Sequence, residues 1–393
     1  MTLKLISYTP SVTHCYVNQR PHEVHLGEVM QHLPLDTTPN NIANELHSAN
    51  SLSLPDALNE AKLLSQALDA STLLSGLQQC AQQGAKYALL GIPEDIGPKA
   101  NLGRGGAHQA WPAFLSRFLN LQSNEFLRGD DIVLLGEVDC HALTAKANAL
   151  SNDNVDDIEG LRNLCAALDG YVHPIIEQIV KAGLEPIVIG GGHNNAYPIL
   201  KGASQALDTP LAAANLDPHS DFRPLEGRHS GNGFHYAQQQ GYLSAYYVLG
   251  LHELKNSQAC FSALKDKGFK YDSYQSLWLR QEKTFTQAID EATDYLLKDI
   301  LPLGIEVDID SIAFMPVSAY SNCGVTIAHA EQYVYSLACL PEATYLHLCE
   351  GAPAQHPSGI EQGNSDVGQG LSALVNAYLQ GRIHYQLNEA QKS

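Results

Sequence analysis

Carboxylate and imidazole side chains gather in four short motifs of this chain, and each motif directly follows a short apolar run. Such residues at the ends of apolar runs are the usual ligands of hard divalent cations and the usual acids and bases of hydrolytic sites. In chain order the motifs are GGHNNA with His193, LDPHSDFR with Asp217, His219 and Asp221, GIEVDID with Asp308 and Asp310, and TYLHLCE with Glu350.

The spacing within two of the motifs predicts a metal centre. In an extended segment, residues i, i+2 and i+4 point to one side, so Asp217, His219 and Asp221 can converge on one point, and Asp308 and Asp310 repeat that geometry. Four such aspartates buried with two imidazoles would repel one another strongly without cations, and two divalent ions balance their charge. Oxygen-rich ligation with some imidazole suits Mn²⁺ and disfavours ions that seek thiolates.

The elements that must position these motifs are short apolar strands that alternate with helices. Runs that are apolar throughout are typical of parallel strands covered on both faces, and the alternation predicts a three-layer, doubly wound, mostly parallel α/β sheet that binds ligands at its carboxyl edge. The expected strands are Tyr87–Ile92, Ile132–Val138, Pro186–Ile189, Leu211–Leu216, Tyr246–Leu251, Ile305–Ile309 and Thr344–Cys349. The expected helices are Ile158–Lys181, Gln287–Asp299, Ala328–Leu340 and Ser365–Gln380.

The first 85 residues differ in character from the rest. They are polar and carry helix-like stretches, as in Pro55–Gln79, whereas alternation of strands and helices starts at Lys86. We therefore expect a partly helical N-terminal extension over residues 1–85, of unknown role, and one α/β domain over residues 86–393.

Composition excludes several classes of protein. The 393 residues include 23 Lys and Arg against 42 Asp and Glu, a formal charge of −19, which opposes binding to nucleic acid or to an anionic membrane. The eight cysteines form no CxxC pair, so neither a disulfide framework nor a thiolate zinc site is indicated. The sequence shows no signal-peptide pattern and no apolar run of about 20 residues, so we expect the protein in the cytoplasm.

Taken together and in this order, the motifs resemble the ureohydrolase superfamily, which includes arginase, agmatinase and formimidoylglutamase. The resemblance covers about residues 86 to 385 and implies an arginase-like metallohydrolase domain, two Mn²⁺ per subunit bridged by hydroxide, and a homo-oligomer. By that resemblance, His193, Asp217, Asp221 and Asp308 hold one ion, and His219, Asp217, Asp308 and Asp310 hold the other, with Asp217 and Asp308 bridging.

Within the superfamily, the formimidoylglutamase branch is the nearer likeness. Asn101 with Gly103–Ala107 resembles its NxGRxGA loop, DFR with Arg223 resembles its DxR, and SGNGF from Ser230 resembles its SGTPF. The arginase pattern DxDxxDP is broken because Ala313 and Phe314 replace its last two residues. The resemblance implies a hydrolase that cleaves C–N bonds of linear amidines, converting N-formimino-L-glutamate to L-glutamate and formamide in histidine degradation.

The resemblance also implies roles around the metals. Glu350 is expected to pair with the cationic C–N group of the substrate, and Asp310 to carry a proton to the leaving nitrogen. His229 stands where arginase has a proton-shuttling histidine, although an ordinary loop histidine is an equal alternative. The expected substrate-binding residues are Asn101, Arg104, Arg223, Ser230 and Glu350.

The placement of basic residues favours an acidic substrate. Arg104, Arg223 and Arg228 all lie in loops that flank the metal motifs of a chain poor in basic residues, and arginine matches a carboxylate in bidentate geometry. The alternative for any one of them is a local ion pair that holds the loop. Two alternatives remain for the whole protein: a ureohydrolase that releases urea from a guanidino substrate, and a non-enzymatic, metal-binding regulatory member.

Overall fold

The computed structural model describes residues 2–34 and 52–392, which form one sheet of nine described strands with helices on both faces. The strand order is β1-β3-β2-β4-β9-β8-β5-β6-β7, and every pair is parallel except β1 with β3. The strands are β1 (Leu5–Ser7), β2 (Tyr87–Gly91), β3 (Ile132–Val138), β4 (Glu185–Ile189), β5 (Leu211–Leu216), β6 (Leu243–Leu251), β7 (Lys270–Ser273), β8 (Leu303–Asp308) and β9 (Ala343–Cys349).

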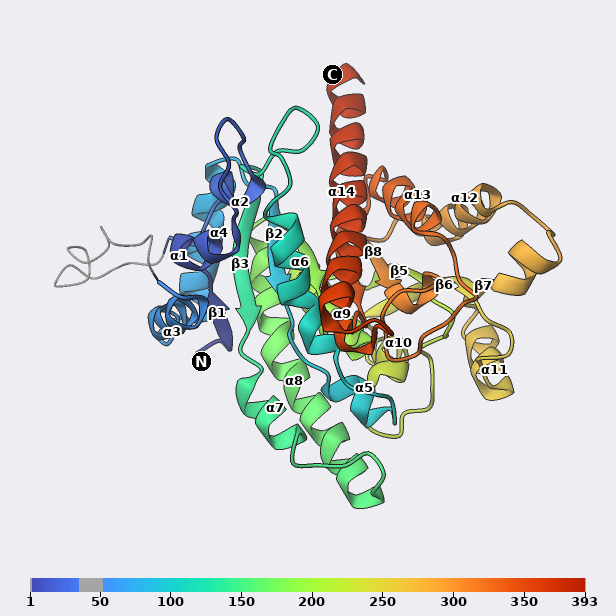
Figure 1. The fold of residues 1–393 in the computed structure, drawn as a ribbon. Coiled ribbons are helices and arrows are strands. Elements are labelled where there is room, and N and C mark those ends of the chain that lie inside the picture. The colour runs from blue at the N-terminus through green and yellow to red at the C-terminus, as the bar shows by residue number, and fades with distance from the viewer. Residues whose placement is uncertain (1, 35–51, 393) are drawn as a thin grey trace.

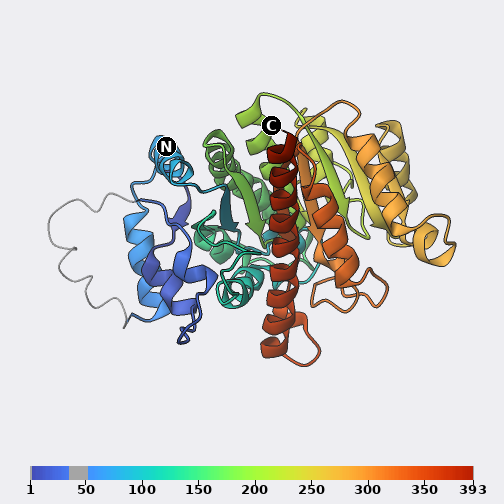
Figure 2. The ribbon, with the colours of Figure 1, turned by 90° about the horizontal axis from the view of Figure 1, so that it is seen from above.

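Two separate hydrophobic clusters, one on each face of the sheet, hold the helices in place. One face is covered by α6, α12, α13 and α14, and the other by α4, α8, α9, α10 and α11 (Figures 1 and 2). The helices are α1 (Pro10–Tyr16), α2 (Leu26–Val29), α3 (Leu54–Leu64), α4 (Ala70–Gln82), α5 (Ile96–Ala100), α6 (Ala110–Phe118), α7 (His141–Ala147), α8 (Val155–Lys181), α9 (Ala196–Leu207), α10 (Gly233–Gln239), α11 (Gln258–Asp266), α12 (Phe285–Leu296), α13 (Ile327–Ala338) and α14 (Ile360–Lys392).

The strand sequences explain the three layers. Alternate residues of a strand face opposite sides of the sheet, and in β5 Ala212 and Ala214 join one cluster while Leu211 and Ala213 join the other. All four are buried. A strand with both faces covered must be apolar at every position, which confirms the prediction of a mostly parallel, doubly wound sheet.

All seven predicted strands are present, and two further strands were not predicted from the sequence. β1 is only three residues long, and β7 has the sequence KYDS, with Lys270 and Tyr271 exposed at the edge of the sheet. Edge strands need apolar residues on one face at most, so the continuous apolar signal fails there. The four predicted helices correspond to α8, α12, α13 and α14.

The N-terminal segment packs against one end of the sheet (Figure 1). β1 pairs with β3, Tyr8 donates a hydrogen bond to Glu137 at 2.7 Å, and Trp111 donates to Tyr8 at 3.0 Å. The helical stretch predicted over Pro55–Gln79 is two helices, α3 and α4, because the Asp69 side chain accepts from Thr72 N–H and so caps a new helix. Residues 1 and 35–51 of the predicted extension lie outside the described residues.

None of the helices within the described ranges combines the length and the apolar character that a bilayer span requires.

Candidate metal centre and substrate cavity

Four strands that are neighbours in the centre of the sheet carry the four motifs. They are β4, β9, β8 and β5, in that spatial order, and their carboxyl ends lie along one edge because they are parallel. His193 follows β4, Asp217 follows β5, Asp308 ends β8 and Glu350 follows β9. The crossovers therefore bring together residues more than 150 positions apart in the chain.

The loop that carries His193 is shaped by glycine and clamped by Glu94. Gly191 has a φ of +74°, and a Cβ there would lie 2.8 Å from Glu94 Oε1. Glu94 is fully buried, and its Oε1 accepts from Gly192 N–H and from the Asn195 side chain, both at 2.7 Å. The sequence analysis missed Glu94, because only the fold shows that this loop residue lies beneath a motif 98 positions later.

The first group of candidate ligands is His193, Asp217, Asp221 and Asp308. His193 Nδ1 lies 2.8 Å from Asp221 Oδ2, 3.1 Å from Asp217 Oδ2 and 3.7 Å from Asp308 Oδ2. All four residues are buried. One imidazole nitrogen and three carboxylates thus face a single point, as the sequence predicts for one metal ion.

The second group is Asp217, His219 and Asp310. His219 Nδ1 lies 3.1 Å from Asp310 Oδ2 and 3.4 Å from Asp217 Oδ1. Asp217 therefore turns one oxygen toward each group, which is the geometry of a bridging ligand. Asp308, the expected second bridge, belongs to the first group, and its Oδ1 accepts the Asp310 backbone N–H at 2.8 Å, just as Asp217 Oδ1 accepts the His219 N–H at 2.6 Å.

The electrostatics of the groups favour bound cations. Burial, together with the charge of Asp217, raises the pKa of Asp221 to about 6, and burial with the charges of Asp310 and Asp217 raises the pKa of Asp308. Burial also acts to raise the pKa of Asp217, but hydrogen bonds to His193 and His219 outweigh it and hold that pKa below its usual range. Asp310 Oδ1 is buried without a hydrogen-bond partner among the described residues. This set of oxygen and imidazole donors fits Mn²⁺.

A cavity of about 580 Å³ adjoins both groups. Its lining includes Asp221 and Asp308 of the first group, His219 and Asp310 of the second, and Glu350. Glu350 has a φ of +66°, and its Oε1 accepts the backbone N–H of His193 at 2.9 Å. Burial, followed by the charges of Asp310 and Asp221, raises the pKa of Glu350 to about 8, even though the hydrogen bond from His193 lowers it.

Three of the predicted substrate-binding side chains form a chain of hydrogen bonds on the cavity wall. Arg223 donates to Asn101 Oδ1 at 2.8 Å, and Asn101 Nδ2 donates to Ser230 Oγ at 3.3 Å. Lys255, which follows β6, lines the same cavity, and its Nζ makes no hydrogen bond or ion pair with any described residue. The sequence analysis missed Lys255, although its position just beyond a strand at the carboxyl edge is a usable signal.

The other predicted side chains lie elsewhere. Arg104 is exposed, outside the described cavity lining, and donates to the Ser318 carbonyl at 2.8 Å. Arg228 is buried and pairs with Asp169 at 2.9 Å, so the alternative of a local ion pair describes it.

His229 is buried outside the cavity lining, and its Nδ1 accepts from Gly231 N–H. Burial first, and then nearby arginines, lower the pKa of His229 to about 3, so its geometry favours a cap of its loop over a proton shuttle.

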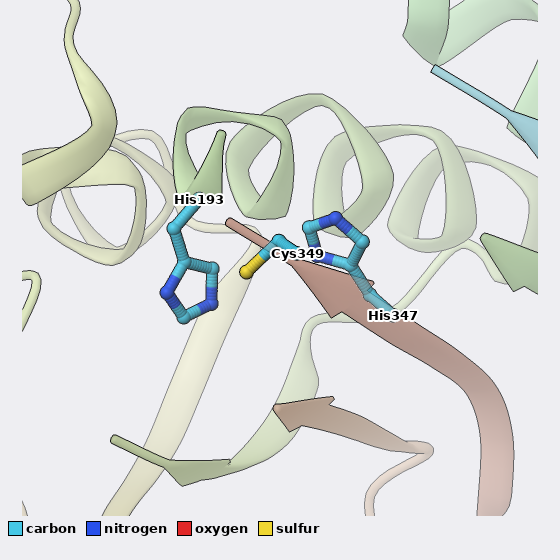
Figure 3. Close-up of side chains that lie close together, drawn as sticks. All are labelled: His193, His347 and Cys349. Atoms are coloured by element: carbon cyan, nitrogen blue, oxygen red, sulfur yellow. The ribbon is translucent and has the colours of Figure 1, made fainter. Parts of the chain in front are cut away.

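Two buried residues beneath His193 were also missed. Glu306 of β8 and His347 of β9 are register partners, and His347 Nδ1 lies 2.6 Å from Glu306 Oε2. His193, His347 and Cys349 also come close together, with the Cys349 sulfur directed toward the His193 ring (Figure 3). The sequence does carry a signal for Glu306: it is an acid in the middle of the apolar run GIEVD. A charge buried in a strand requires a partner, so a polar residue on a neighbouring strand could have been expected.

Comparison with known proteins identifies the family. The model of the arginase family matches residues 85–366, well over half of the chain. The chain belongs to the arginase family. The formimidoylglutamase of Streptococcus pyogenes is 28% identical over 253 residues, which cover 62% of this chain and 70% of that protein.

Solved structures of this arginase-family fold superpose on the chain. The formimidoylglutamase of Bacillus subtilis gives a TM-score of 0.62 at 17% identity and covers 76% of this chain and 88% of that one. The formiminoglutamase of Trypanosoma cruzi with Mn²⁺ gives 0.59 at 18% identity, over 78% and 97%. At such identities the likeness shows the fold alone.

Membership of the family confirms the prediction of a hydrolase that acts on C–N bonds of linear amidines. The predicted ureohydrolase resemblance and the arginase-like fold are confirmed as well.

Proposed function

We propose that this arginase-family chain is a dinuclear manganese formimidoylglutamase that hydrolyses N-formimino-L-glutamate to L-glutamate and formamide, a step of histidine degradation. The observation that carries the proposal is one cavity with an acidic metal-ligand cluster at its floor and two basic side chains, Arg223 and Lys255, on its wall. The relative from S. pyogenes that bears the name formimidoylglutamase supports the same substrate.

The two ligand groups would hold the manganese pair, with Asp217 shared between them. Bound there, the pair would supply Lewis-acid charge and a nucleophilic hydroxide at neutral pH. The six predicted ligands His193, Asp217, His219, Asp221, Asp308 and Asp310 all belong to these groups.

Glu350 would orient the amidine. One of its oxygens is already held by the backbone N–H of His193, which fixes the carboxylate and leaves the other oxygen for an N–H of the substrate. A cationic amidinium favours the ionised form of this buried acid, in the same way that a neighbouring positive charge lowers any carboxyl pKa. Recognition of the amidine and ionisation of Glu350 therefore support each other.

Asp310 would move the proton that the leaving amine needs. Its Oδ2 lies against His219, whereas its Oδ1 is buried and without a hydrogen bond among the described residues. An amine leaves well only when it is protonated, so a carboxylate at the cavity floor with one oxygen unengaged is placed to hold and release that proton.

Arg223 and Lys255 would bind the two carboxylates of the substrate. Arg223 is held by Asn101 and by an ion pair with Glu226 at 3.3 Å, whereas Lys255 Nζ is without a hydrogen bond or an ion pair in the described part of the chain. Charged hydrogen bonds are each worth about 1.5–3 kcal/mol. Two cations fit a dicarboxylate better than the cationic tail of agmatine.

The test is a product assay on the Mn²⁺-loaded chain. N-formimino-L-glutamate, arginine and agmatine are each supplied, and glutamate, formamide and urea are measured. Release of glutamate and formamide from the first substrate, with no urea from the other two, is the expected result. Urea from arginine or agmatine without glutamate from formiminoglutamate would overturn the proposed substrate, and so would inactivity on all three.

A further inference from the structure

The imidazole of His193 has a second nitrogen, Nε2, which faces away from the ligand groups and whose partner the metal centre does not explain. Nε2 of His193 is fully buried and makes no hydrogen bond with the described residues. A carboxylate oxygen, Glu306 Oε2, lies 3.4 Å from it. An imidazole N–H buried in this way is costly unless an acceptor is at hand.

Glu306 is itself held rigidly by residues of β9. Tyr345 donates to Oε1 at 2.6 Å, and His347 Nδ1 lies 2.6 Å from Oε2. These two contacts fix the position of the carboxyl group and leave Oε2 facing His193 as an acceptor.

We propose that Glu306 is a positioning residue for the metal centre: its carboxylate, held by Tyr345 and His347, keeps His193 in the Nε2–H tautomer and so presents Nδ1 to the ion. In the metal-free chain the carboxylates around Nδ1 can themselves accept a hydrogen from it, so Glu306 matters once an ion takes Nδ1: the remaining imidazole proton then stands on Nε2 and faces Glu306. Metal-bound histidines commonly donate their second N–H to a carboxylate in this manner, and loss of that partner weakens binding about 10- to 100-fold.

A rival use of the same atoms is a third metal ion at His193, His347 and Cys349, whose ligand atoms lie within 4.8 Å of one another. Such an ion would need the Nε2 atom of His193 as a ligand rather than as a donor. The Cys349 thiol donates a hydrogen bond to the Val307 carbonyl at 3.6 Å. His347 Nδ1 is already in contact with Glu306. These contacts favour the hydrogen-bonded network.

The inference rests on the metal centre of the proposed function but not on its substrate, and it is tested by Mn²⁺ affinity and by NMR. Calorimetric titration of the metal-free full chain is expected to show a 10- to 100-fold loss of Mn²⁺ affinity in Glu306→Gln. Tyr333→Phe, which removes a hydrogen bond to the Glu306 backbone carbonyl but leaves the carboxylate and its partners in place, is the matched control and should change the affinity much less. Equal affinities for wild type and Glu306→Gln would overturn the inference while leaving the metal centre intact.

The tautomer gives a second readout that needs no stable variant at Glu306. Long-range ¹H–¹⁵N correlation of the wild type loaded with Zn²⁺, a diamagnetic stand-in for Mn²⁺, with His193 assigned by His193→Asn, is expected to show a proton on Nε2 and none on Nδ1. An unprotonated Nε2 in the loaded chain would overturn the inference. So would three bound ions per chain that fall to two in Cys349→Ser, because Nε2 would then be a ligand.

Discussion

Replacing Glu94 by glutamine tests how the His193 loop is held. Each oxygen of this buried carboxylate accepts two N–H groups. Oε1 accepts from Gly192 and Asn195, and Oε2 accepts from Ile96 at 2.6 Å and Gly97 at 3.2 Å. Burial raises the pKa of Glu94, and hydrogen bonds from Gly192, Gly97 and Asn195 counteract that effect by favouring the carboxylate.

A glutamine keeps one accepting oxygen, so two of the four donors must face its NH₂ group whichever way the amide is turned. A buried donor without an acceptor costs about 1–3 kcal/mol, so two cost about 2–6 kcal/mol. Against a typical free energy of unfolding of about 5–15 kcal/mol, that loss is large.

The assay is urea-induced unfolding of the metal-free protein in EDTA, so that metal binding does not contribute to the free energy. Glu125→Gln is the matched control, because Glu125 is exposed and its side chain makes no hydrogen bond with the described residues. A loss below about 1 kcal/mol in Glu94→Gln, with an unchanged slope against urea, would refute the count of four donors.

Three further substitutions separate metal binding, substrate binding and folding. Glu350→Gln should leave the Mn²⁺ content unchanged and lower kcat/KM about 10- to 100-fold through loss of a charged hydrogen bond; normal kinetics would remove Glu350 from the site. Lys255→Met should raise KM for formiminoglutamate about 10-fold, whereas Lys267→Met on the exposed end of α11 should not; equal KM values would exclude Lys255 from carboxylate binding. Arg228→Met leaves Asp169 buried without its partner and should cost about 3–5 kcal/mol of unfolding free energy; a urea midpoint equal to wild type would contradict that role.

The central sheet could be predicted because its strands are buried on both faces and are therefore apolar at every position. The metal motifs could be predicted for a related reason: they follow those strands, and parallel strands end at the same edge of the sheet. β7 escaped prediction because an edge strand tolerates residues such as Lys270, which is exposed.

The supporting residues could not be predicted because their partners are distant in the chain. From the sequence, Arg228 could equally face an acidic substrate or form a local ion pair, and only the fold places Asp169 beside it, 59 positions away. Glu306 and His347 are 41 positions apart and meet only through the register of β8 with β9. Spacing within a motif shows which side chains share a side, whereas the partner of a buried charge depends on the topology of the whole sheet.

The most direct test of the metal centre is anomalous diffraction at the manganese edge from crystals of the Mn²⁺-loaded chain. Two peaks about 3.5 Å apart are expected, as in other two-metal sites, one beside His193 and the other beside His219, with Asp217 between them. A single peak, or a peak enclosed by His193, His347 and Cys349, would contradict the dinuclear centre described above.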